Sequence, residues 1–398
     1  MERLPYLTQD HPGTGGRLKV QADDFLVEEI PLYQPCGEGQ HAYLFVEKRG
    51  ISTYNMVGRI ASALGVSPEA VGYAGLKDAR AVTRQLISIE GVTPEQAQSL
   101  QLDGIRVLWS ARHRNKLKLG HLAGNRFTLR IRGVEREATS IAATVLAELA
   151  RRGAPNYFGQ QRFGVRENTH LLGRELLRND GAAFVHEYLG RPQADERPDL
   201  QAARSLVDAG DYAAALAAWP PGLRDERRVL EALVRSSGNL ERTLRAINND
   251  LRRLAMSAYQ SHLFNQLLVQ RIQGLDRLEP GDVAFIHASG AAFVVQEAAI
   301  EQPRADRFEI SPSGPLFGPK CLLAGGAPGE RERAVLAESG LSLEAFRLPG
   351  IKMKGARRPY RVPIGDAHVE WDDGLVLQFQ LPPGSYATEV LREVMKSD

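Results

Sequence analysis

Residues 72–85 contain the side chains of this sequence best suited to chemistry. Lys77 and Asp78 lie in a turn loosened by Gly72 and Gly75, and the apolar, β-branched residues 86–89 that follow are typical of a strand. A carboxylate beside an ammonium group, on a loop held by a rigid element, is a plausible centre for catalysis. The alternative is an aspartate that forms a turn or caps a helix by bonding its own backbone. This stretch alone leaves both interpretations open.

The elements before this turn are expected to position it. Ser52 or Thr53 can cap a helix, and Phe25 falls at a junction between a loop and a strand, where its ring can face the core or a cleft. The turn therefore lies between a helix and a strand. Strands are expected over residues 17–20, 25–31 and 41–48, and helices over residues 53–64 and from residue 67.

Two stretches of the chain carry basic residues and no acidic ones. They are residues 104–134 and 347–365, and the alternating pattern of 127–132 places the later arginines of the first stretch on one face of a strand. Such stretches suit a groove that neutralises phosphates, and the alternative is a solvated, charged surface. The side chains expected to contact phosphates are Arg126, Arg130, Arg132, Lys354, Arg357 and Arg358.

The middle of the chain differs in character from its ends. Basic, strand-rich parts at both ends enclose a mainly helical region, which indicates one domain split by an insertion. Ser385 is expected to cap the last helix, with Tyr386 in its first turn. Helices are expected over 138–151, 200–218, 228–247 and 251–273, a hairpin over 283–286 and 292–295, and strands over 369–371 and 376–381.

Composition limits the class of protein. The chain has 398 residues, 43% of them hydrophobic and 25% charged, with a formal net charge of +2, which fits two or three globular domains. Cys36 and Cys321 are far apart, so neither a disulfide framework nor a structural zinc site is expected. No apolar stretch approaches the roughly 20 residues that cross a membrane, and the first residues lack a signal-peptide pattern. We expect a cytoplasmic protein.

Four motifs together resemble a known family. They are residues 75–85 (GLKDARAVTRQ), 124–127 (GNRF), 156–164 (NYFGQQRFG) and 384–388 (GSYAT). Taken in order, they resemble the TruD family of tRNA pseudouridine synthases, and the matches run from Lys19 to Arg392. The resemblance therefore covers nearly the whole chain.

The resemblance implies a fold and an activity. The fold is α/β (α+β): a pseudouridine synthase catalytic domain with a mixed sheet, formed by residues 1–155 and 348–398, and interrupted by an inserted, largely helical TRUD domain at residues 156–347. The activity is isomerisation of uridine to pseudouridine, at position 13 of tRNA in bacterial-type members. The partner implied is tRNA, with no cofactor, no metal, no membrane and no obligate protein partner.

The resemblance also implies roles for the turn. Asp78 corresponds to the nucleophilic aspartate of the family. A nearby cation keeps such a carboxylate ionised in a partly dry pocket. The resemblance favours Lys19, and Lys77 and Arg80 of the motif are further candidates. Whether Asp78 attacks C1' or C6, and which base removes the proton from C5, stay open.

Three residues outside the turn are implied to contact the substrate. Phe25 resembles the ring that stacks on the target uracil, where it can replace stacking lost when the base leaves its helix. Asn125 resembles the substrate-contacting asparagine. Tyr386 stands where the family often has phenylalanine. Residues 156–164 either shape the wall of a cleft or only seat the inserted domain.

Two other functions are alternatives to a pseudouridine synthase. A non-catalytic RNA-binding protein could use the same basic strands and would not depend on Asp78. A nucleotide-dependent enzyme is suggested by the glycine pattern of residues 37–42, which superficially fits the dinucleotide fingerprint. That pattern follows Pro35 and Cys36 rather than a clear strand, and no convincing helix begins there, which argues against it.

Overall fold

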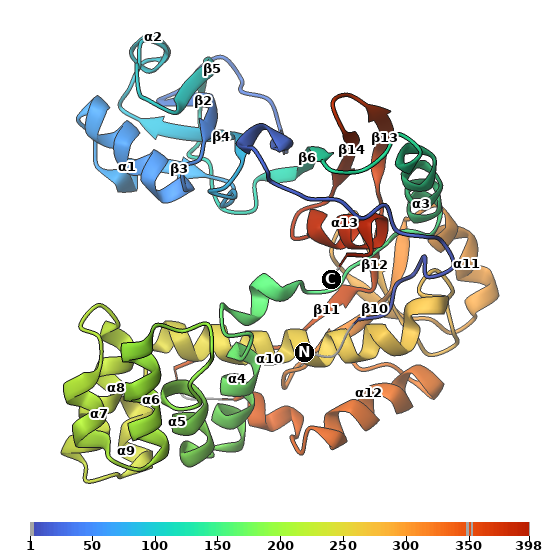
Figure 1. Ribbon diagram of the computed structural model, residues 1–398. Helices are drawn as coiled ribbons and strands as arrows, with labels where there is room; N and C mark the ends of the chain where they lie inside the picture. The colour runs from blue at the N-terminus through green and yellow to red at the C-terminus, as the bar shows by residue number, and fades with distance from the viewer. Residues whose placement is uncertain (1–3, 348–349, 352, 398) are drawn as a thin grey trace. The chain divides into compact units, whose positions relative to one another are not determined.

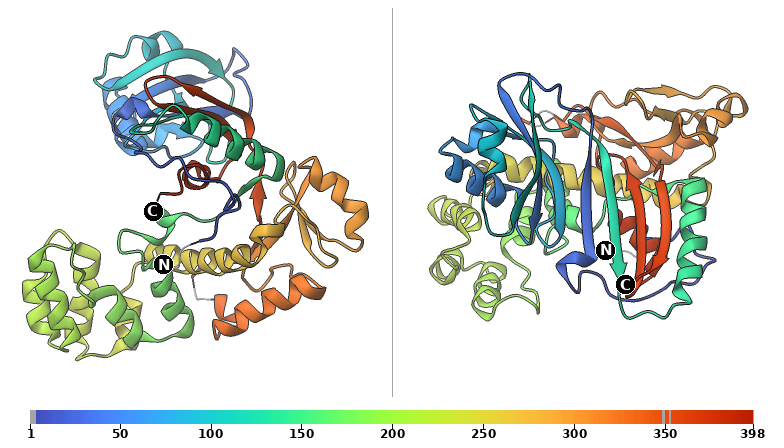
Figure 2. Two further views of the ribbon diagram at one scale, coloured as in Figure 1. Left: turned by 45° about the vertical axis from the view of Figure 1, so that its right-hand side comes forward. Right: turned by 90° about the horizontal axis from the view of Figure 1, so that it is seen from above.

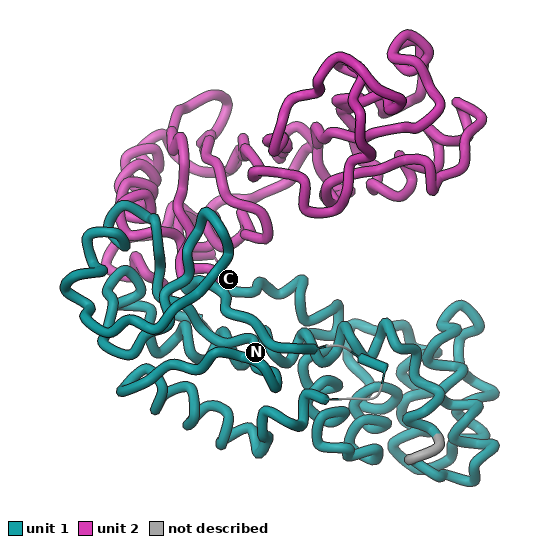
Figure 3. Tube along the Cα trace, turned by 180° about the vertical axis from the view of Figure 1, so that it is seen from behind, with its two compact units in different colours: residues 1–5, 157–360 teal, residues 6–156, 361–398 magenta. Residues whose placement is uncertain are grey.

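The computed structural model describes residues 4–347, 350–351 and 353–397. The chain forms two compact units (Figure 3). Unit 2 comprises Tyr6–Asn156 and Arg361–Asp398, and unit 1 comprises Tyr157–Tyr360 together with Leu4 and Pro5. The turn that contains Asp78 belongs to unit 2.

A mixed sheet forms the centre of unit 2 (Figures 1 and 2). In the described residues its strand order is β13-β14-β6-β1-β4-β2-β5, with β3 beside β4. The pair β1 and β4 is parallel, whereas the other pairs are antiparallel. The strands are β1 (Phe25–Pro31), β2 (His41–Arg49), β3 (Val71–Tyr73), β4 (Val82–Glu90), β5 (Ile105–His113), β6 (Leu122–Ile131), β13 (Gly365–Trp371) and β14 (Leu375–Leu381).

Alternation along β2 separates two hydrophobic clusters. Ala42, Leu44 and Val46 belong to the cluster that includes α1 (Thr53–Leu64), whereas Tyr43 and Phe45 belong to a second cluster with Ala74 and Leu86. Successive side chains of a strand point to opposite faces, so one strand contributes to both clusters. The remaining helices of unit 2 are α2 (Pro94–Gln98), α3 (Ala138–Arg152), which lies against β13, and α13 (Ala387–Met395), which lies against α3.

The chain leaves unit 2 and returns to it at adjacent points. β7 (Ala154–Pro155) pairs with β12 (Arg361–Val362), so that Pro155 lies opposite Arg361. The guanidinium of Arg361 also donates to the backbone oxygen of Arg152, at 2.7 Å. All of unit 1 between Tyr157 and Tyr360 is therefore inserted between two neighbouring strands.

Unit 1 combines helices with a small antiparallel sheet. The sheet has the order β11-β10-β8-β9, and the long helix α10 packs against α4 (Figure 1). Its strands are β8 (Val283–Ile286), β9 (Ala292–Val294), β10 (Ile310–Leu316) and β11 (Ala356–Pro359). Its helices are α4 (Thr169–Arg178), α5 (Gly181–Leu189), α6 (Pro198–Asp208), α7 (Tyr212–Ala218), α8 (Arg224–Arg235), α9 (Leu240–Arg245), α10 (Asn249–Arg271), α11 (Ala298–Asp306) and α12 (Gly326–Glu338).

Most of the expected elements are confirmed. Ser52 caps α1 by accepting from the backbone N–H of Asn55, as expected. Strands β1, β2, β4, β6 and β14, the hairpin β8–β9, and helices α3 and α10 also form within a few residues of their expected ranges. The alternating and helical patterns of those segments are long enough to determine their type.

Five local expectations are wrong. Residues 200–218 are two helices, α6 and α7, because Gly210 has a positive φ just after α6 ends. Residues 17–20 form only a bridge between Arg17 and Arg132, and residues 67–70 give only a three-residue 3-10 helix. Residues 228–247 are two helices, because Ser237 and Gly238 have positive φ values that end α8. The N-cap of α13 is Tyr386, without a side-chain cap, instead of Ser385.

The second expected domain boundary falls between residues 347 and 348. Residues 348–349, where the sequence placed it, lie outside the described residues. Beyond them, β11 pairs with β10 of unit 1, and unit 2 resumes at Arg361. Among the described residues, no helix is both long and apolar enough to cross a membrane.

Candidate active site

Asp78 lies in the loop between β3 and β4, and the neighbouring residue Lys77 holds this loop through buried contacts. The ammonium of Lys77 is 2.7 Å from Oε2 of Glu29, and both side chains are almost completely buried. The backbone N–H of Lys77 donates to Oγ1 of Thr53, at 3.0 Å, which attaches the loop to the start of α1. Burial raises the pKa of Glu29, while the charge of Lys77 opposes that shift. Lys77 is therefore an anchor for the loop.

Two further side chains hold the loop. Gln85 of β4 donates to the backbone oxygen of Gly75 at 3.4 Å and accepts from Oγ1 of Thr53 at 3.1 Å. Lys48 of β2 donates to the backbone oxygen of Asp78 at 2.8 Å. Neighbouring strands and a helix thus support the Asp78 loop, as a preorganised site requires.

The carboxylate of Asp78 is ion-paired and partly open to solvent. Lys19 pairs with Oδ2, and the backbone N–H of Arg80 donates to Oδ1 at 2.9 Å. Burial would raise the pKa of Asp78, but the bonds from Lys19 and Arg80 and the charges of Lys19 and Lys48 outweigh burial and lower the pKa below its usual 3.8. The side chain is 30% exposed, so an ionised carboxylate faces an accessible surface.

Lys19 connects Asp78 with the expected stacking ring. Its ammonium lies 4.2 Å from the ring centroid of Phe25, the first residue of β1. Phe25 is only 5% exposed, and Lys19 has a left-handed backbone with φ of 54°. Cation, ring and carboxylate therefore form one cluster, in which the cation covers a face of the ring.

Asn125 and Tyr386 lie on neighbouring elements of the same unit. Asn125 of β6 is opposite Glu29 of β1 on one side and Leu381 of β14 on the other. Its Oδ1 is buried and has no hydrogen-bond partner in the described part of the chain. Tyr386 begins α13, shortly after β14 ends. The sheet thus places Asn125 beside β1, the strand that begins with Phe25.

The arginines expected to contact phosphates in unit 2 are paired with carboxylates from other elements. Arg132 contacts Asp24 at 2.8 Å and Asp373 at 2.9 Å. Arg130 contacts Asp372 at 2.5 Å. Burial disfavours ionised Asp24, but its bonds from Arg132 and from the N–H of Gln21 lower its pKa overall. Acids from other parts of the chain therefore pair with Arg130 and Arg132, and the contact of these arginines with phosphates stays a prediction.

Arg126 is different, because it remains 48% exposed although it contacts Glu28 at 3.0 Å. In unit 1 Lys354 is exposed, whereas Arg357 is buried and contacts Glu332 at 2.8 Å. Arg357 thus has a buried partner within unit 1, and the phosphate contact expected for it stays a prediction. Arg358 places its guanidinium 4.1 Å from the ring centroid of Phe158.

Residues 157–163 pack on α10 of unit 1. The backbone of Phe158 exchanges two 2.9 Å hydrogen bonds with the side chain of Asn265. Arg162 donates to Ser261 at 3.1 Å, and the rings of Phe158 and Phe264 meet edge to face. These contacts give the motif a packing role within unit 1.

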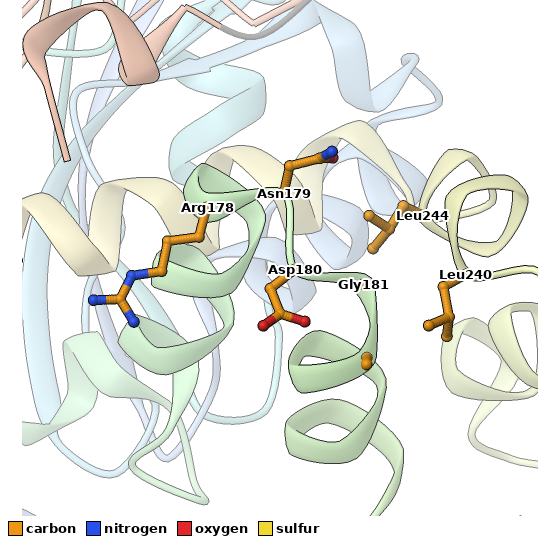
Figure 4. Close-up of a pocket in the computed structure, with 7 residues that line it drawn as sticks. Arg178, Asn179, Asp180, Gly181, Leu240 and Leu244 are labelled. Carbon is orange, nitrogen blue, oxygen red and sulfur yellow. The ribbon is translucent and has the colours of Figure 1, made fainter. Parts of the chain in front are cut away.

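A cavity of about 480 Å³ lies in unit 1, at the junction of α4 and α5 (Figure 4). Asp180 at its edge caps α5 by accepting from the N–H of Ala183. None of the sequence-predicted site residues lines it; Arg178, Asn179, Leu240 and Leu244 are among the residues that do. Among the described residues, no group of His, Cys, Asp and Glu side chains could hold a metal ion.

Sequence reasoning missed four residues that support Asp78. Glu29, Thr53 and Gln85 are ordinary polar residues in sequence, and only the sheet brings them together. Lys48 offered a signal, because it continues the inward row of Ala42, Leu44 and Val46. A lysine at a core position of a strand is unusual unless it has a specific partner.

The chain is similar to known proteins over nearly its whole length. The family described as tRNA pseudouridine synthase D (TruD) matches residues 3–394. A Geobacter metallireducens protein named tRNA pseudouridine synthase D is 50% identical over 393 residues, covering 98% of this chain and 97% of its own length. One from Anaeromyxobacter sp. (strain Fw109-5), with the same name, is 38% identical over 399 residues, covering 100% and 97%.

A solved structure extends the comparison to the fold. A crystal structure from Methanosarcina mazei, assigned to tRNA pseudouridine synthase D (TruD), matches with a TM-score of 0.87 and 31% identity. The match covers 99% of this chain and 96% of that one. Because sequence and fold agree over nearly the full length, this chain belongs to the TruD family of tRNA pseudouridine synthases.

Proposed function

We propose that this protein converts a uridine of tRNA to pseudouridine, with Asp78 as the nucleophile. The observation that carries the proposal is the Asp78 carboxylate itself, which is partly exposed, has a lowered pKa and sits on a loop held by buried contacts. Family membership and the names of the relatives support the reaction and the substrate. Uridine 13 is the position expected from the family.

The reaction is an isomerisation whose atoms balance without a cofactor. The bond from N1 to C1' breaks, the uracil turns, and C5 forms a bond to C1'; C5 then loses its proton and N1 gains one. Asp78 can hold one fragment covalently while the other reorients. Attack at C1' and attack at C6 are both compatible with a carboxylate in this position.

Phe25 and Asn125 are proposed to bind the target base. A base stacked on an aromatic ring gains about 1–3 kcal/mol, but Lys19 covers a face of Phe25. We infer that the uracil displaces the Lys19 ammonium from that face. The unpartnered Oδ1 of Asn125 is an acceptor that an N–H of uracil can satisfy. Tyr386 can add a further ring contact from the start of α13.

We infer that unit 2 is the catalytic domain and unit 1 the inserted domain of the family. Phosphate contacts are proposed for Arg126 and Lys354, whose side chains are the more exposed ones of the predicted set. An exposed ion pair such as that of Arg126 is weak, so a phosphate can replace its carboxylate. The cytoplasm, where tRNA is the substrate, is the proposed compartment.

Asp78→Asn tests the proposal. The expected result is complete loss of tritium release from tRNA labelled at C5 of uridine, with tRNA affinity largely kept, because the amide is not a nucleophile. Asp23→Asn is the matched control, since Asp23 is also paired with a cation, Arg49, but lies outside the loop. Turnover of Asp78→Asn at the wild-type rate would instead favour a non-catalytic RNA-binding protein.

A second measurement tests the position. Wild-type protein is incubated with tRNA transcripts that carry uridine or cytidine at position 13, and pseudouridine is then mapped. Product at position 13 of the uridine transcript alone is expected. Pseudouridine at another position, formed at the same rate in both transcripts, would support the synthase activity but refute position 13 as its target.

A further inference from the structure

Lys48 is a buried cation in the wall of the Asp78 loop. It follows Ala42, Leu44 and Val46 on the face of β2 that packs toward α1, and it has no exposed surface. An ammonium group in such apolar surroundings is unfavourable unless its hydrogens are bonded. Its contacts must therefore account for its presence.

The amine of Lys48 bonds to two backbone carbonyls. It donates to the oxygen of Asp78 at 2.8 Å and to the oxygen of Ile51 at 2.5 Å. In the described part of the chain, no carboxylate lies within ion-pair distance of it. Lys48 thus ties Asp78 to the segment that enters α1, and brings a positive charge behind the carboxylate-bearing residue.

The charged groups that face Lys48 come from the loop. Burial is the largest effect on the pKa of Lys48 and lowers it to about 8. The negative charge of Asp78 raises this pKa, and the positive charge of Lys77 lowers it. The neighbours of Lys48 on β2 point to the opposite face, where Glu47 pairs with Arg84 and Arg106, and Arg49 pairs with Asp23. The charge of Lys48 is therefore directed at the loop.

We propose that Lys48 is a positioning residue for the reaction, which holds the main chain of Asp78 in place and adds a second cation that keeps its carboxylate ionised. The proposal rests on the function proposed above. Lys19 pairs with the carboxylate from the open side, whereas Lys48 acts from inside the sheet. Substrate can displace Lys19 without removing Lys48.

A purely structural role makes a different prediction. A methionine fills nearly the same volume as a lysine stem and removes the cost of burying a charge, but it leaves the carbonyls of Asp78 and Ile51 without this donor, which costs some stability. If Lys48 served only packing, Lys48→Met would keep activity. Because it acts on Asp78, we expect the folded Lys48→Met protein to have a kcat lowered roughly tenfold to a hundredfold, as expected for a displaced reacting group.

The experiment measures kcat, KM, tRNA dissociation constant and thermal unfolding of the full-length protein. Lys48→Met should lower kcat while KM and tRNA affinity stay at wild-type values. The matched control is Lys396→Met, because Lys396 of unit 2 also donates to two backbone carbonyls, those of Thr8 and His11, at the far end of α13. The control should keep the wild-type kcat.

A pH profile supplies a readout independent of the variant. At saturating tRNA, wild-type kcat should fall above about pH 8, where Lys48 loses its proton, and Lys48→Met should lack this fall. Wild-type kcat in Lys48→Met, or a change confined to stability or tRNA affinity, would overturn the proposal. If Lys48→Met does not fold, a wild-type kcat that stays constant well above that pH overturns it. A wild-type protein that forms no pseudouridine refutes the proposed function instead.

Discussion

Asp78 makes both a turn bond to its own backbone segment and an ion pair with a cation, the two kinds of contact considered for it from the sequence. Its Oδ1 accepts from the N–H of Arg80, which is the local turn bond of an aspartate two residues earlier. Its Oδ2 pairs with Lys19. The turn fixes the direction of the carboxylate and leaves the second oxygen for a cation, so the two interpretations of this residue are compatible.

Lys19→Met should make catalysis more sensitive to acid. Lys19 supplies both a hydrogen bond and a charge that lower the pKa of Asp78, and burial alone raises it. Without Lys19 the carboxylate therefore takes up its proton at a higher pH than in the wild type. The acid limb of log(kcat/KM) against pH should move to higher pH in this variant, measured by tritium release at tRNA concentrations well below KM.

The control for this prediction is Lys396→Met, which leaves the loop unchanged. An acid limb at the wild-type position in Lys19→Met, with only the absolute rate reduced, would contradict the role assigned to Lys19 in ionising Asp78. The same profile with Asp78 replaced should show no pH-dependent activity at all.

Sequence reasoning about the partner of Asp78 was limited by distance along the chain. Lys77 and Arg80 are adjacent to Asp78, but the ammonium of Lys77 pairs with Glu29 and Arg80 contributes its backbone N–H. Lys19, 59 positions away, supplies the ion pair. Proximity in sequence could not decide this, because the folded sheet determines which side chain reaches the carboxylate; only the family resemblance favoured Lys19.

At the level of elements, the buried pair of Glu29 in β1 and Lys77 in the loop should be strongly coupled. Lys77→Met leaves a buried carboxylate without its partner, which costs about 3–5 kcal/mol of unfolding free energy. In the double variant Glu29→Leu, Lys77→Met, both charges are gone and most of this loss should be recovered. Urea unfolding of the wild type, the two single variants and the double variant measures the coupling.

Additive losses in that cycle would show that the pair contributes nothing specific. Activity provides a second comparison for the same variants. The double variant should regain stability without regaining full kcat, because the anchor of the Asp78 loop is still missing.

The salt dependence of tRNA binding should separate the paired from the exposed basic residues. Lys354→Ala should reduce the slope of log Kobs against log salt by about one phosphate contact, because its side chain is exposed. Arg132→Ala should leave the slope unchanged, because Arg132 is already bonded to Asp24 and Asp373. A reduced slope for Arg132→Ala would contradict this and would support the phosphate contact that the sequence predicts for Arg132.

The ion pairs of Arg130 and Arg132 show which features of a strand a sequence can predict and which it cannot. Alternation predicted the later part of β6, which buries one face, and the apolar and aromatic residues 42–46 indicated β2, which buries both faces. Residues 104–134 contain no acid, yet Asp372 and Asp373, in the turn between β13 and β14, neutralise Arg130 and Arg132. Cross-strand neighbours from distant parts of the chain are not visible in a local charge pattern.

At the level of the whole molecule, unit 2 should fold without unit 1. β7 and β12 bring residues 155 and 361 opposite each other, so a short linker can replace residues 157–360. We expect the shortened protein to unfold cooperatively on heating and to show strand-rich circular dichroism. A gradual transition with no near-ultraviolet signal would show that unit 2 depends on unit 1 for its packing.

The pairing of β6 with β14 also has a consequence for the way a ribosome makes this protein. Leu129 of β6 lies opposite Leu377 of β14, so the inner strand must wait for a partner from near the end of the message. At about 5–20 residues per second, that wait is on the order of tens of seconds. During it the nascent chain presents an open strand edge, which is the kind of surface that invites intermolecular pairing. Translation speed, and the chaperones that meet the emerging chain, should therefore influence how much of this protein reaches its active form.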